Sequence, residues 1–250
     1  MRRRAFLGTA AVMAGASALP LRAQNAPVTF VLIHGAWHGA WCWQLLTPLL
    51  EARGHEVIAP TLAGMGERTS ELSDAITLDT HIDEVVDLLD RKRVQNAVLV
   101  GHSYAGVVIS GVADRVPHRL RRLVFLDGVI VENGQSLGGA RMVGRAAALP
   151  PMPASAFGVV DVVERAWVES NLKPHPANTF ATPLRLTHPL GNGLRCIYVA
   201  CTRPAMASVG RYLQMARTRL GWRVEELATG HDAMVTAPSP LADLLDRIAV

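Results

Sequence analysis

The chain has 250 residues and a mass of 26.9 kDa, half of them hydrophobic and only 18% charged. That balance excludes an intrinsically disordered protein and is sufficient for one sizeable core. The net charge of +4 would suggest nucleic-acid binding if it were spread over the fold. Residues 1–23 hold four arginines and no acidic residue, so basic and acidic side chains are equal in number beyond them and no nucleic-acid partner is expected.

Residues 1–23 have the pattern of a secretory signal, with arginines, an apolar run over residues 5–18 and a break at Pro20. Arg-Arg-Ala-Phe-Leu at residues 3–7 resembles the twin-arginine export motif, a receptor-read address of bacterial proteins. The apolar run is shorter than the roughly 20 residues of a membrane-spanning helix. We therefore expect a periplasmic or secreted protein with no membrane association after removal of the leader.

Short apolar runs alternate with amphipathic stretches over most of the remaining chain. Strands are predicted at residues 28–33, 55–60, 97–100, 123–126, 195–200 and 223–227, and helices at 41–53, 78–92, 104–115, 206–219 and 241–248. This alternation predicts an α/β fold, with a doubly wound, mostly parallel sheet of about six strands covered by helices on both faces.

The alternation stops between Glu132 and Gly193, where seven prolines accompany scattered helical pieces. A structureless loop of that length is uncommon inside a compact domain. We therefore predict a small cap at residues 133–190 over the carboxyl edge of the sheet. Residues 24–132 and 191–250 would then form the core.

Cysteine and histidine spacing gives no metal site. The three cysteines, Cys42, Cys196 and Cys201, are an odd number, which excludes a complete disulfide framework. No Cys/His cluster has the spacing of zinc ligands. We expect three small buried cysteine side chains, no metal and no cofactor.

Gly101-His102-Ser103-Tyr104-Ala105 lies where the third predicted strand meets the third predicted helix. This is the pattern of a nucleophile elbow, a sharp turn that presents a serine hydroxyl above the sheet, here with Ala in its last place. Ser103 is therefore the candidate nucleophile. The backbone N–H groups of Tyr104, which follows it, and of Ala36, after the first strand, are the candidate oxyanion donors.

Three histidines deserve separate interpretations. His231, in the loop after the sixth predicted strand, is the last histidine in the chain and follows the elbow at the same edge of the sheet, so it is the candidate base. His34 and His38 flank the proposed oxyanion donor. For both of them, hydrogen bonds that shape the loop are a better interpretation than a role as base.

The doubled run His34-Gly35-Ala36-Trp37-His38-Gly39-Ala40-Trp41, followed by the elbow and by Gly230-His231, resembles the α/β-hydrolase superfamily. More narrowly, it is similar to the branch that contains plant methylesterases, hydroxynitrile lyases and related bacterial esterases. The resemblance covers residues 28–250 and is weakest in the predicted cap. It implies a serine hydrolase that cleaves carboxylic esters through an acyl-enzyme on Ser103.

The position of the catalytic acid departs from that branch. The acid there usually follows the fifth strand, where this chain has Thr202-Arg203-Pro204, and no acidic residue lies between Arg195 and Gly221. Asp127, directly after the fourth strand, occupies the alternative position used by haloalkane dehalogenase relatives, and is our prediction. Asp232 is the first alternative, and a Ser–His dyad with water is the second.

Two other functions compete with ester hydrolysis. A hydroxynitrile-lyase-like carbon–carbon lyase would have a lysine after the catalytic histidine and a threonine after the first-strand histidine, where this chain has Asp232 and Gly35. A non-catalytic homologue that binds a small ligand is disfavoured because serine, histidine and a plausible acid are all retained.

The substrate is expected to be a small, uncharged, hydrophobic or aromatic ester. Candidate pocket residues are aromatic or sulfur-containing side chains of the first loop and the cap: Trp37, Met142, Phe157, Trp167 and Phe180. The sequence leaves open the acid and alcohol halves of the ester. It also leaves open the oligomeric state, including a homodimer.

Overall fold

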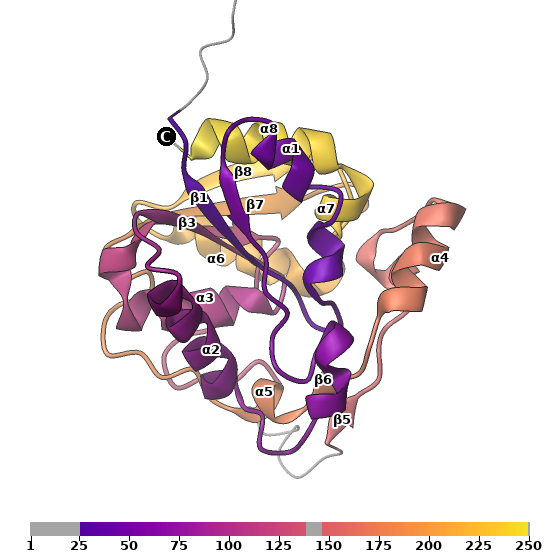
Figure 1. The fold of residues 1–250 in the computed structure, drawn as a ribbon, viewed down its shortest axis with the longest axis horizontal. Coiled ribbons are helices and arrows are strands. Elements are labelled where there is room, and N and C mark those ends of the chain that lie inside the picture. Colours follow the sequence, from indigo (N-terminus) through magenta and orange to yellow (C-terminus); the bar gives the residue numbers. More distant parts are fainter. Residues whose placement is uncertain (1–25, 139–146, 250) are drawn as a thin grey trace, which may run out of the picture.

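The computed structural model describes residues 26–138 and 147–249, so the leader and Met142 lie outside the described residues. Its centre is a parallel sheet in the order β2-β1-β3-β4-β7-β8 (Figure 1). The strands are β1 (Thr29–Ile33), β2 (Glu56–Ile58), β3 (Ala97–His102), β4 (Leu120–Leu126), β7 (Arg195–Cys201) and β8 (Arg223–Leu227). The predicted six-stranded parallel sheet is confirmed.

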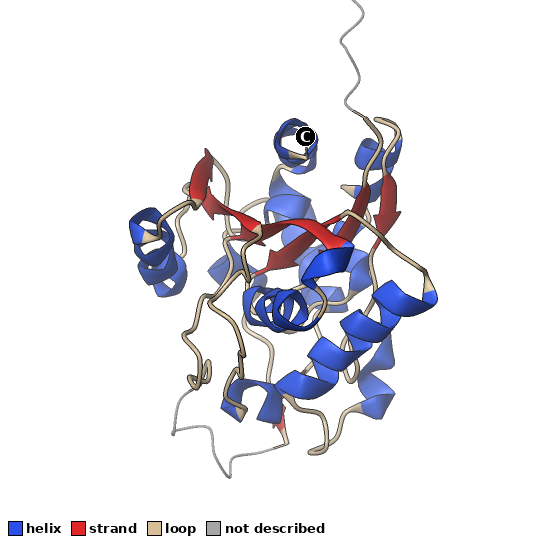
Figure 2. Ribbon diagram, turned by 90° about the vertical axis from the view of Figure 1, so that its left-hand side faces the viewer, coloured by secondary structure: helices blue, strands red, loops and turns tan. Residues whose placement is uncertain are grey.

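Alternate residues of the central strands face two separate cores, as the period of two along a strand requires. Val31 and Ile33 of β1 pack in one core with α2 (Leu78–Arg91), α3 (Ala105–Arg115) and α6 (Gly210–Thr218). Phe30 and Leu32 pack in the other with α1 (Thr47–Glu51), α7 (Ala233–Thr236) and α8 (Pro238–Ile248). Figure 2 shows the twisted sheet between these two layers of helices.

Two predicted helices are interrupted, and one short helix was missed. The helix predicted at 41–53 is a 3-10 turn (Ala40–Trp43) followed by α1, which begins one residue before Pro48. The helix predicted at 206–219 begins with a 3-10 turn (Ala207–Val209), and α6 starts at Gly210. The short α7 lies between the sixth strand and α8 and was not predicted.

Residues 147–190 form small elements beside the carboxyl edge of the sheet. They are the two-residue strands β5 (Ala148–Leu149) and β6 (His175–Pro176), with helices α4 (Val162–Asn171) and α5 (Asn178–Ala181). Trp37, after β1, donates from Nε1 to the carbonyl of Leu149, and the N–H of Lys173 donates to the carbonyl of Trp37. This segment therefore contacts a loop of the strand edge, while α4 stands apart from the sheet (Figure 1).

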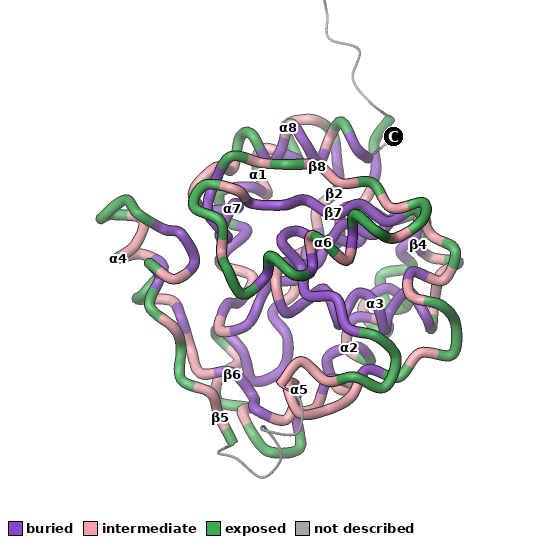
Figure 3. Tube along the Cα trace, turned by 180° about the vertical axis from the view of Figure 1, so that it is seen from behind, coloured by how far each residue is buried: buried purple, intermediate pink, exposed green. Residues whose placement is uncertain are grey.

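Burial follows this arrangement: the central strands are buried, and much of α4 and the outer turns are exposed (Figure 3). The three cysteines are free and buried, as expected. Among residues 26–138 and 147–249, no helix has the length and apolar character needed to cross a membrane. The same residues contain no cluster of three His, Cys, Asp or Glu side chains that could hold a metal ion.

Candidate active site

Ser103 lies at the turn between β3 and α3 in a strained backbone conformation, with a φ of 52°. The turn is held on both sides, because the N–H of Ser103 donates to the Leu126 carbonyl over 3.1 Å and its own carbonyl accepts from the N–H of Val129 over 2.8 Å. A Cβ at Gly101 would lie 2.7 Å from the Ala105 carbonyl oxygen. Glycine two positions before the serine is therefore a steric requirement of the turn.

His231 and Asp127 form a buried pair at the same edge. Nδ1 of His231 lies 2.7 Å from Oδ2 of Asp127, and the residues are 1% and 2% exposed. Asp127 follows β4, with its N–H donating to the Val199 carbonyl and its Oδ1 accepting from the N–H of Cys201. In a neutral His231 that donates from Nδ1 to the carboxylate, Nε2 is the basic nitrogen.

The loop that carries His231 is fixed to the elbow through His102, the residue before Ser103. Nε2 of His102 donates to the carbonyl of His231 over 3.0 Å, and the two rings lie 4.6 Å apart between centroids. Burial lowers the pKa of His102 well below its usual value, so this histidine is neutral. His102 therefore connects the loop of His231 to the turn that carries Ser103.

The proposed oxyanion donors flank the same serine. Ala36 and Tyr104 line one pocket with Ser103, and within the described residues the backbone N–H of neither donates a hydrogen bond. A Cβ at Gly35 would lie 3.0 Å from Cβ of Ser103 and 2.8 Å from Nδ1 of His102. Glycine therefore lets the loop after β1 approach the elbow this closely.

The histidines of the first loop bind backbone and carboxylate groups. His34 contacts the Gly35 carbonyl through Nδ1 and accepts the N–H of Leu62 at Nε2. Burial lowers its pKa to about 3, so His34 is neutral and shapes the loop. His38 binds Asp232 at 3.1 Å. Asp232, the alternative acid for His231, is therefore occupied by a different histidine.

The Tyr104 side chain contacts α2, the helix that carries His81. Its hydroxyl donates to Nδ1 of His81, whose Nε2 donates to the Ala63 carbonyl. Burial lowers the pKa of His81 to about 4, which keeps the ring neutral and able to accept. The Tyr104 ring also stacks on Phe180, with 5.5 Å between centroids. These contacts anchor the residue that supplies one proposed oxyanion donor.

Ser103 opens into a pocket of about 270 Å³ with a mainly apolar wall. Trp37, Phe157 and Phe180 line it. Trp167 does not: its ring packs edge-on against Trp41, 5.2 Å between centroids. Met142 lies outside the described residues. The sequence interpretation missed several lining residues, namely Val129, Leu137, Met206, Ser208, Val209, Arg211 and Tyr212.

Most of the missed residues have a positional signal in the sequence. Val129 follows β4, and Met206, Ser208 and Tyr212 follow β7, so both groups start from carboxyl ends of strands beside the elbow. Ligands of open α/β sheets bind outside those ends. The positions of these residues after predicted strands therefore indicate that they can line the pocket.

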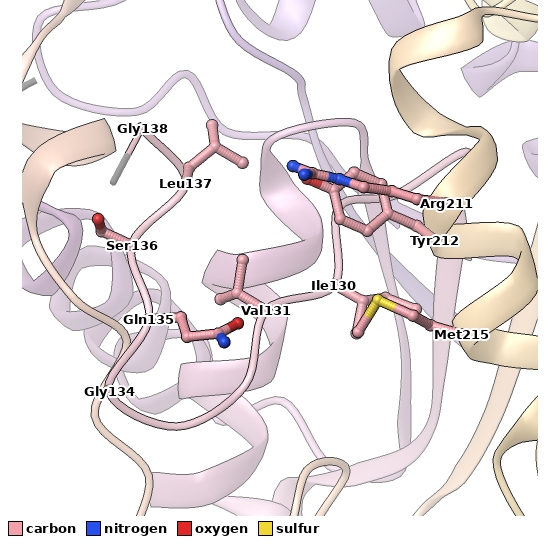
Figure 4. A pocket seen from close by; sticks show the side chains of 10 residues that line it. All are labelled: Ile130, Val131, Gly134, Gln135, Ser136, Leu137, Gly138, Arg211, Tyr212 and Met215. Atoms are coloured by element: carbon pink, nitrogen blue, oxygen red, sulfur yellow. The ribbon is translucent and has the colours of Figure 1, made fainter. Parts of the chain in front are cut away.

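A second, more open pocket of about 600 Å³ adjoins the first and shares Leu137, Arg211 and Tyr212 with it (Figure 4). The Arg211 guanidinium lies over the Tyr212 ring, 4.6 Å from its centroid, and donates to the Tyr212 hydroxyl. Figure 4 shows both side chains projecting from α6 toward the loop that carries Leu137. The two pockets therefore share part of their walls.

Comparison with known sequences gives one family and several named relatives. The sequence model described as "Alpha/beta hydrolase family" matches residues 30–244. A carbendazim hydrolyzing esterase of Nocardioides sp. (strain SG-4G) is 35% identical over 236 residues, covering 86% of this chain and 97% of that protein. Methylesterase 1 of Arabidopsis thaliana is 31% identical over 148 residues, 58% of this chain and 51% of that protein.

Solved structures agree on the fold. An extracellular alpha/beta-hydrolase from a Paenibacillus species superposes with a TM-score of 0.73 at 24% identity, covering 88% of this chain and 98% of that one. A methylesterase from Arabidopsis gives a TM-score of 0.74 at 22% identity, with the same coverage of each chain. At these identities the likeness concerns the fold alone.

Proposed function

Because this chain belongs to the alpha/beta hydrolase family, we propose that it cleaves carboxylic esters through an acyl-enzyme formed on Ser103. The chain is a carboxylic ester hydrolase, as its 35% identity to an esterase over 236 residues indicates. The observation that carries the assignment of residues is the buried 2.7 Å contact between His231 and Asp127 at the strand edge that holds Ser103.

Each residue of the site has a separate role in this mechanism. Nε2 of His231 accepts the proton of the Ser103 hydroxyl as the oxygen attacks the ester carbonyl. Asp127 holds Nδ1 and stabilises the imidazolium that forms. The N–H groups of Ala36 and Tyr104 stabilise the oxyanion, typically by about 3 kcal/mol for each donor.

Collapse of the tetrahedral intermediate releases the alcohol, which receives the proton from His231. The same histidine then takes a proton from a water molecule that attacks the acyl-enzyme. The acid leaves and Ser103 regains its proton. Lyase chemistry is less favoured because Asp232, which follows the catalytic histidine, is bound to His38 and offers no cation to a departing cyanide.

The substrate we propose is a small, uncharged ester with a hydrophobic or aromatic group. The 270 Å³ pocket is walled by Trp37, Phe157, Phe180 and other apolar side chains, which supports such a group. Relatives named as methylesterases support a small alcohol half. Residues 133–190, which we propose as the cap, supply Phe157 and Phe180 to this wall.

Hydrolysis of p-nitrophenyl acetate, butyrate and octanoate by the wild type and Ser103→Ala tests the assignment. Removal of the nucleophile is expected to lower turnover at least about 10⁴-fold. Ser110→Ala is the matched control, because that hydroxyl lies in α3 and donates only to the Gly106 carbonyl. Full hydrolysis by Ser103→Ala, or cyanide release from mandelonitrile without ester hydrolysis, would refute the proposal.

We also propose that residues 1–23 direct the protein out of the bacterial cytoplasm through the twin-arginine route. The arginine pair at residues 3 and 4 and the apolar run that follows support this. In a bacterial host, replacing both arginines with lysine is expected to leave the full-length chain in the cytoplasm, while Arg22→Lys is exported normally. Equal export of both variants would contradict this route.

A further inference from the structure

A second buried histidine–aspartate pair lies beside the catalytic pair, and the mechanism above does not use it. Nε2 of His38 is 3.1 Å from Oδ2 of Asp232, and the two residues are 1% and 0% exposed. Asp232 directly follows His231, and His38 is two residues after Ala36. Each member of the pair therefore belongs to a loop that supplies one part of the catalytic machinery.

The hydrogen bonds of His38 specify its protonation. Nδ1 lies 2.7 Å from the carbonyl oxygen of Ala36, which can only accept, so Nδ1 carries a proton. Nε2 faces the Asp232 carboxylate, which also accepts. Burial alone would lower the pKa of His38, but the charge and hydrogen bond of Asp232 raise it above its usual value. Because acceptors face both ring nitrogens, His38 is an imidazolium that donates to the Ala36 carbonyl and to the Asp232 carboxylate.

On one side, the pair holds a strained turn. The N–H of His38 donates to the Gly35 carbonyl over 3.4 Å, which closes a four-residue turn, and Trp37 at its third position has a φ of 66°. A bulky residue in this conformation persists only when its surroundings hold it there. The bond from Nδ1 of His38 to the Ala36 carbonyl fixes the central peptide of this turn.

On the other side, the pair is anchored to the loop of the catalytic base. The N–H of Asp232 donates to the Phe157 carbonyl, and its Oδ1 lies 3.8 Å from Nε2 of His102. The His38 ring stacks on Trp41, 5.1 Å between centroids, and meets Phe157 edge-on at 5.3 Å. The ion pair thus spans the distance between the oxyanion loop and the base loop without touching the Ser103 pocket.

We infer that His38 and Asp232 are positioning residues for ester hydrolysis, which set the Ala36 N–H in register with the elbow and with His231. This inference rests on the proposed function, because it concerns the oxyanion donor of that reaction. Loss of the pair should leave substrate binding intact and weaken stabilisation of the tetrahedral intermediate. A contact that served folding alone would change stability without this selective effect.

A further histidine–aspartate contact, partly buried and remote from the site, offers a control. Nε2 of His55 lies 3.1 Å from Oδ1 of Asp246, and Nδ1 of His55 accepts from the N–H of Val28, at the amino end of β1. This contact has the same distance, but its histidine carries a proton on Nε2 alone, and it lies at the opposite edge of the sheet. Asp246→Ala therefore reports the cost of losing such a contact away from the site.

The test compares Asp232→Ala, Asp232→Asn and Asp246→Ala with p-nitrophenyl butyrate, after counting active sites with a fluorophosphonate. Asp232→Ala is expected to lower kcat about 10- to 100-fold with KM within threefold, below the roughly 10²- to 10³-fold of a deleted oxyanion donor. Its affinity for a trifluoromethyl ketone that forms a tetrahedral adduct should fall in parallel, while inhibition by butyrate is unchanged. Asp232→Asn, which keeps an acceptor for His38, should recover part of kcat.

Two results would overturn the inference: folded Asp232 variants with kcat within twofold of wild type, or an equal fall of kcat in Asp246→Ala. If neither Asp232 variant folds, His38→Gln, which keeps one side-chain donor, is judged by the same kcat and inhibitor criteria. Ser103→Ala in the same series separates the two proposals. Unaltered hydrolysis by that variant would refute the acyl-enzyme itself, whatever the Asp232 variants do.

Discussion

The carboxylate of Asp127 is held by two different contacts, with Oδ2 on Nδ1 of His231 and Oδ1 on the N–H of Cys201. Replacement by asparagine changes little in shape but presents an amide that favours the wrong tautomer of the histidine. Asp127→Asn is therefore expected to lower kcat about 10³- to 10⁴-fold, with little change in KM. Steady-state hydrolysis of p-nitrophenyl butyrate measures this effect.

Asp232→Asn provides the comparison for that prediction, because both carboxylates are buried and each binds one histidine. The expected loss of kcat is at least tenfold larger for Asp127→Asn than for Asp232→Asn. The reverse order would assign the role of catalytic acid to Asp232. An Asp127→Asn variant with unimpaired kcat would remove Asp127 from the mechanism.

Sequence reasoning selected Asp127 because it directly follows a predicted strand, and the carboxyl ends of parallel strands lie at one edge of the sheet. It could not place Asp232, whose partner His38 is 194 positions away and belongs to a loop with no regular period. The contacts of Trp167 were equally beyond prediction, and its assignment to the pocket was wrong. Its aromatic character predicted burial, but only the packing of α4 shows that Trp41 covers it.

At the scale of elements, α3 approaches the loop after β4 so closely that Gly106 has no room for a side chain. An added Cβ would lie 2.3 Å from the Val129 carbonyl oxygen and 2.8 Å from the Val129 N–H nitrogen. Gly106→Ala must therefore displace α3, and with it the elbow. We expect a loss of stability of about 2 kcal/mol or more, in the range of overpacked sites, together with reduced kcat.

Gly210→Ala is the matched control for Gly106→Ala, since Gly210 also lies in the first turn of a helix but has nothing within 4 Å of an added Cβ. This change should leave kcat unaltered and raise stability by up to about 1 kcal/mol, because alanine restricts the unfolded chain. Urea denaturation of both variants measures the difference. Similar stabilities would show that α3 can move without cost.

The strands were predictable as elements because residues buried on both faces form short continuous apolar runs, as in β3 and β4. The helix predicted at 41–53 is interrupted because Pro48 has no N–H to donate and is tolerated only in the first turn of a helix, so α1 begins there and the 3-10 turn precedes it. The segment 133–190 was located only by its prolines and lost alternation. Composition of that kind indicates an insertion but specifies neither its small strands nor its contacts.

At the scale of the whole molecule, folding buries an unusual set of ionisable rings around the site. Six histidines are at most 1% exposed: His34, His38, His81, His102, His175 and His231. Burial lowers the pKa of four of them, to about 3 for His34, to about 4 for His81 and well below the usual value for His102 and His175. These four histidines therefore bind protons less readily in the folded protein than in the unfolded chain.

This difference makes stability depend on pH in a direction that can be worked out. Below the unfolded pKa of 6.5 the unfolded chain binds protons that His34 and His81 do not bind in the folded state, so the free energy of unfolding falls as pH falls. Each such histidine contributes about 1.4 kcal/mol per pH unit, or about 5 kcal/mol for these two between pH 6.5 and 4.5. His38 does not add to this loss, because its raised pKa keeps it protonated in the folded state.

We therefore expect the urea midpoint to fall steeply between pH 6.5 and 4.5, since about 5 kcal/mol is a large part of a typical stability of 5–15 kcal/mol. His81→Gln provides the internal check. Glutamine can still accept from the Tyr104 hydroxyl and donate to the Ala63 carbonyl, but it does not titrate. The free energy of unfolding of this variant should change less steeply with pH than that of wild type, by about 1.4 kcal/mol per pH unit. A midpoint independent of pH down to 4.5, or equal slopes for the two proteins, would mean that the buried rings exchange protons with solvent as readily as those of the unfolded chain.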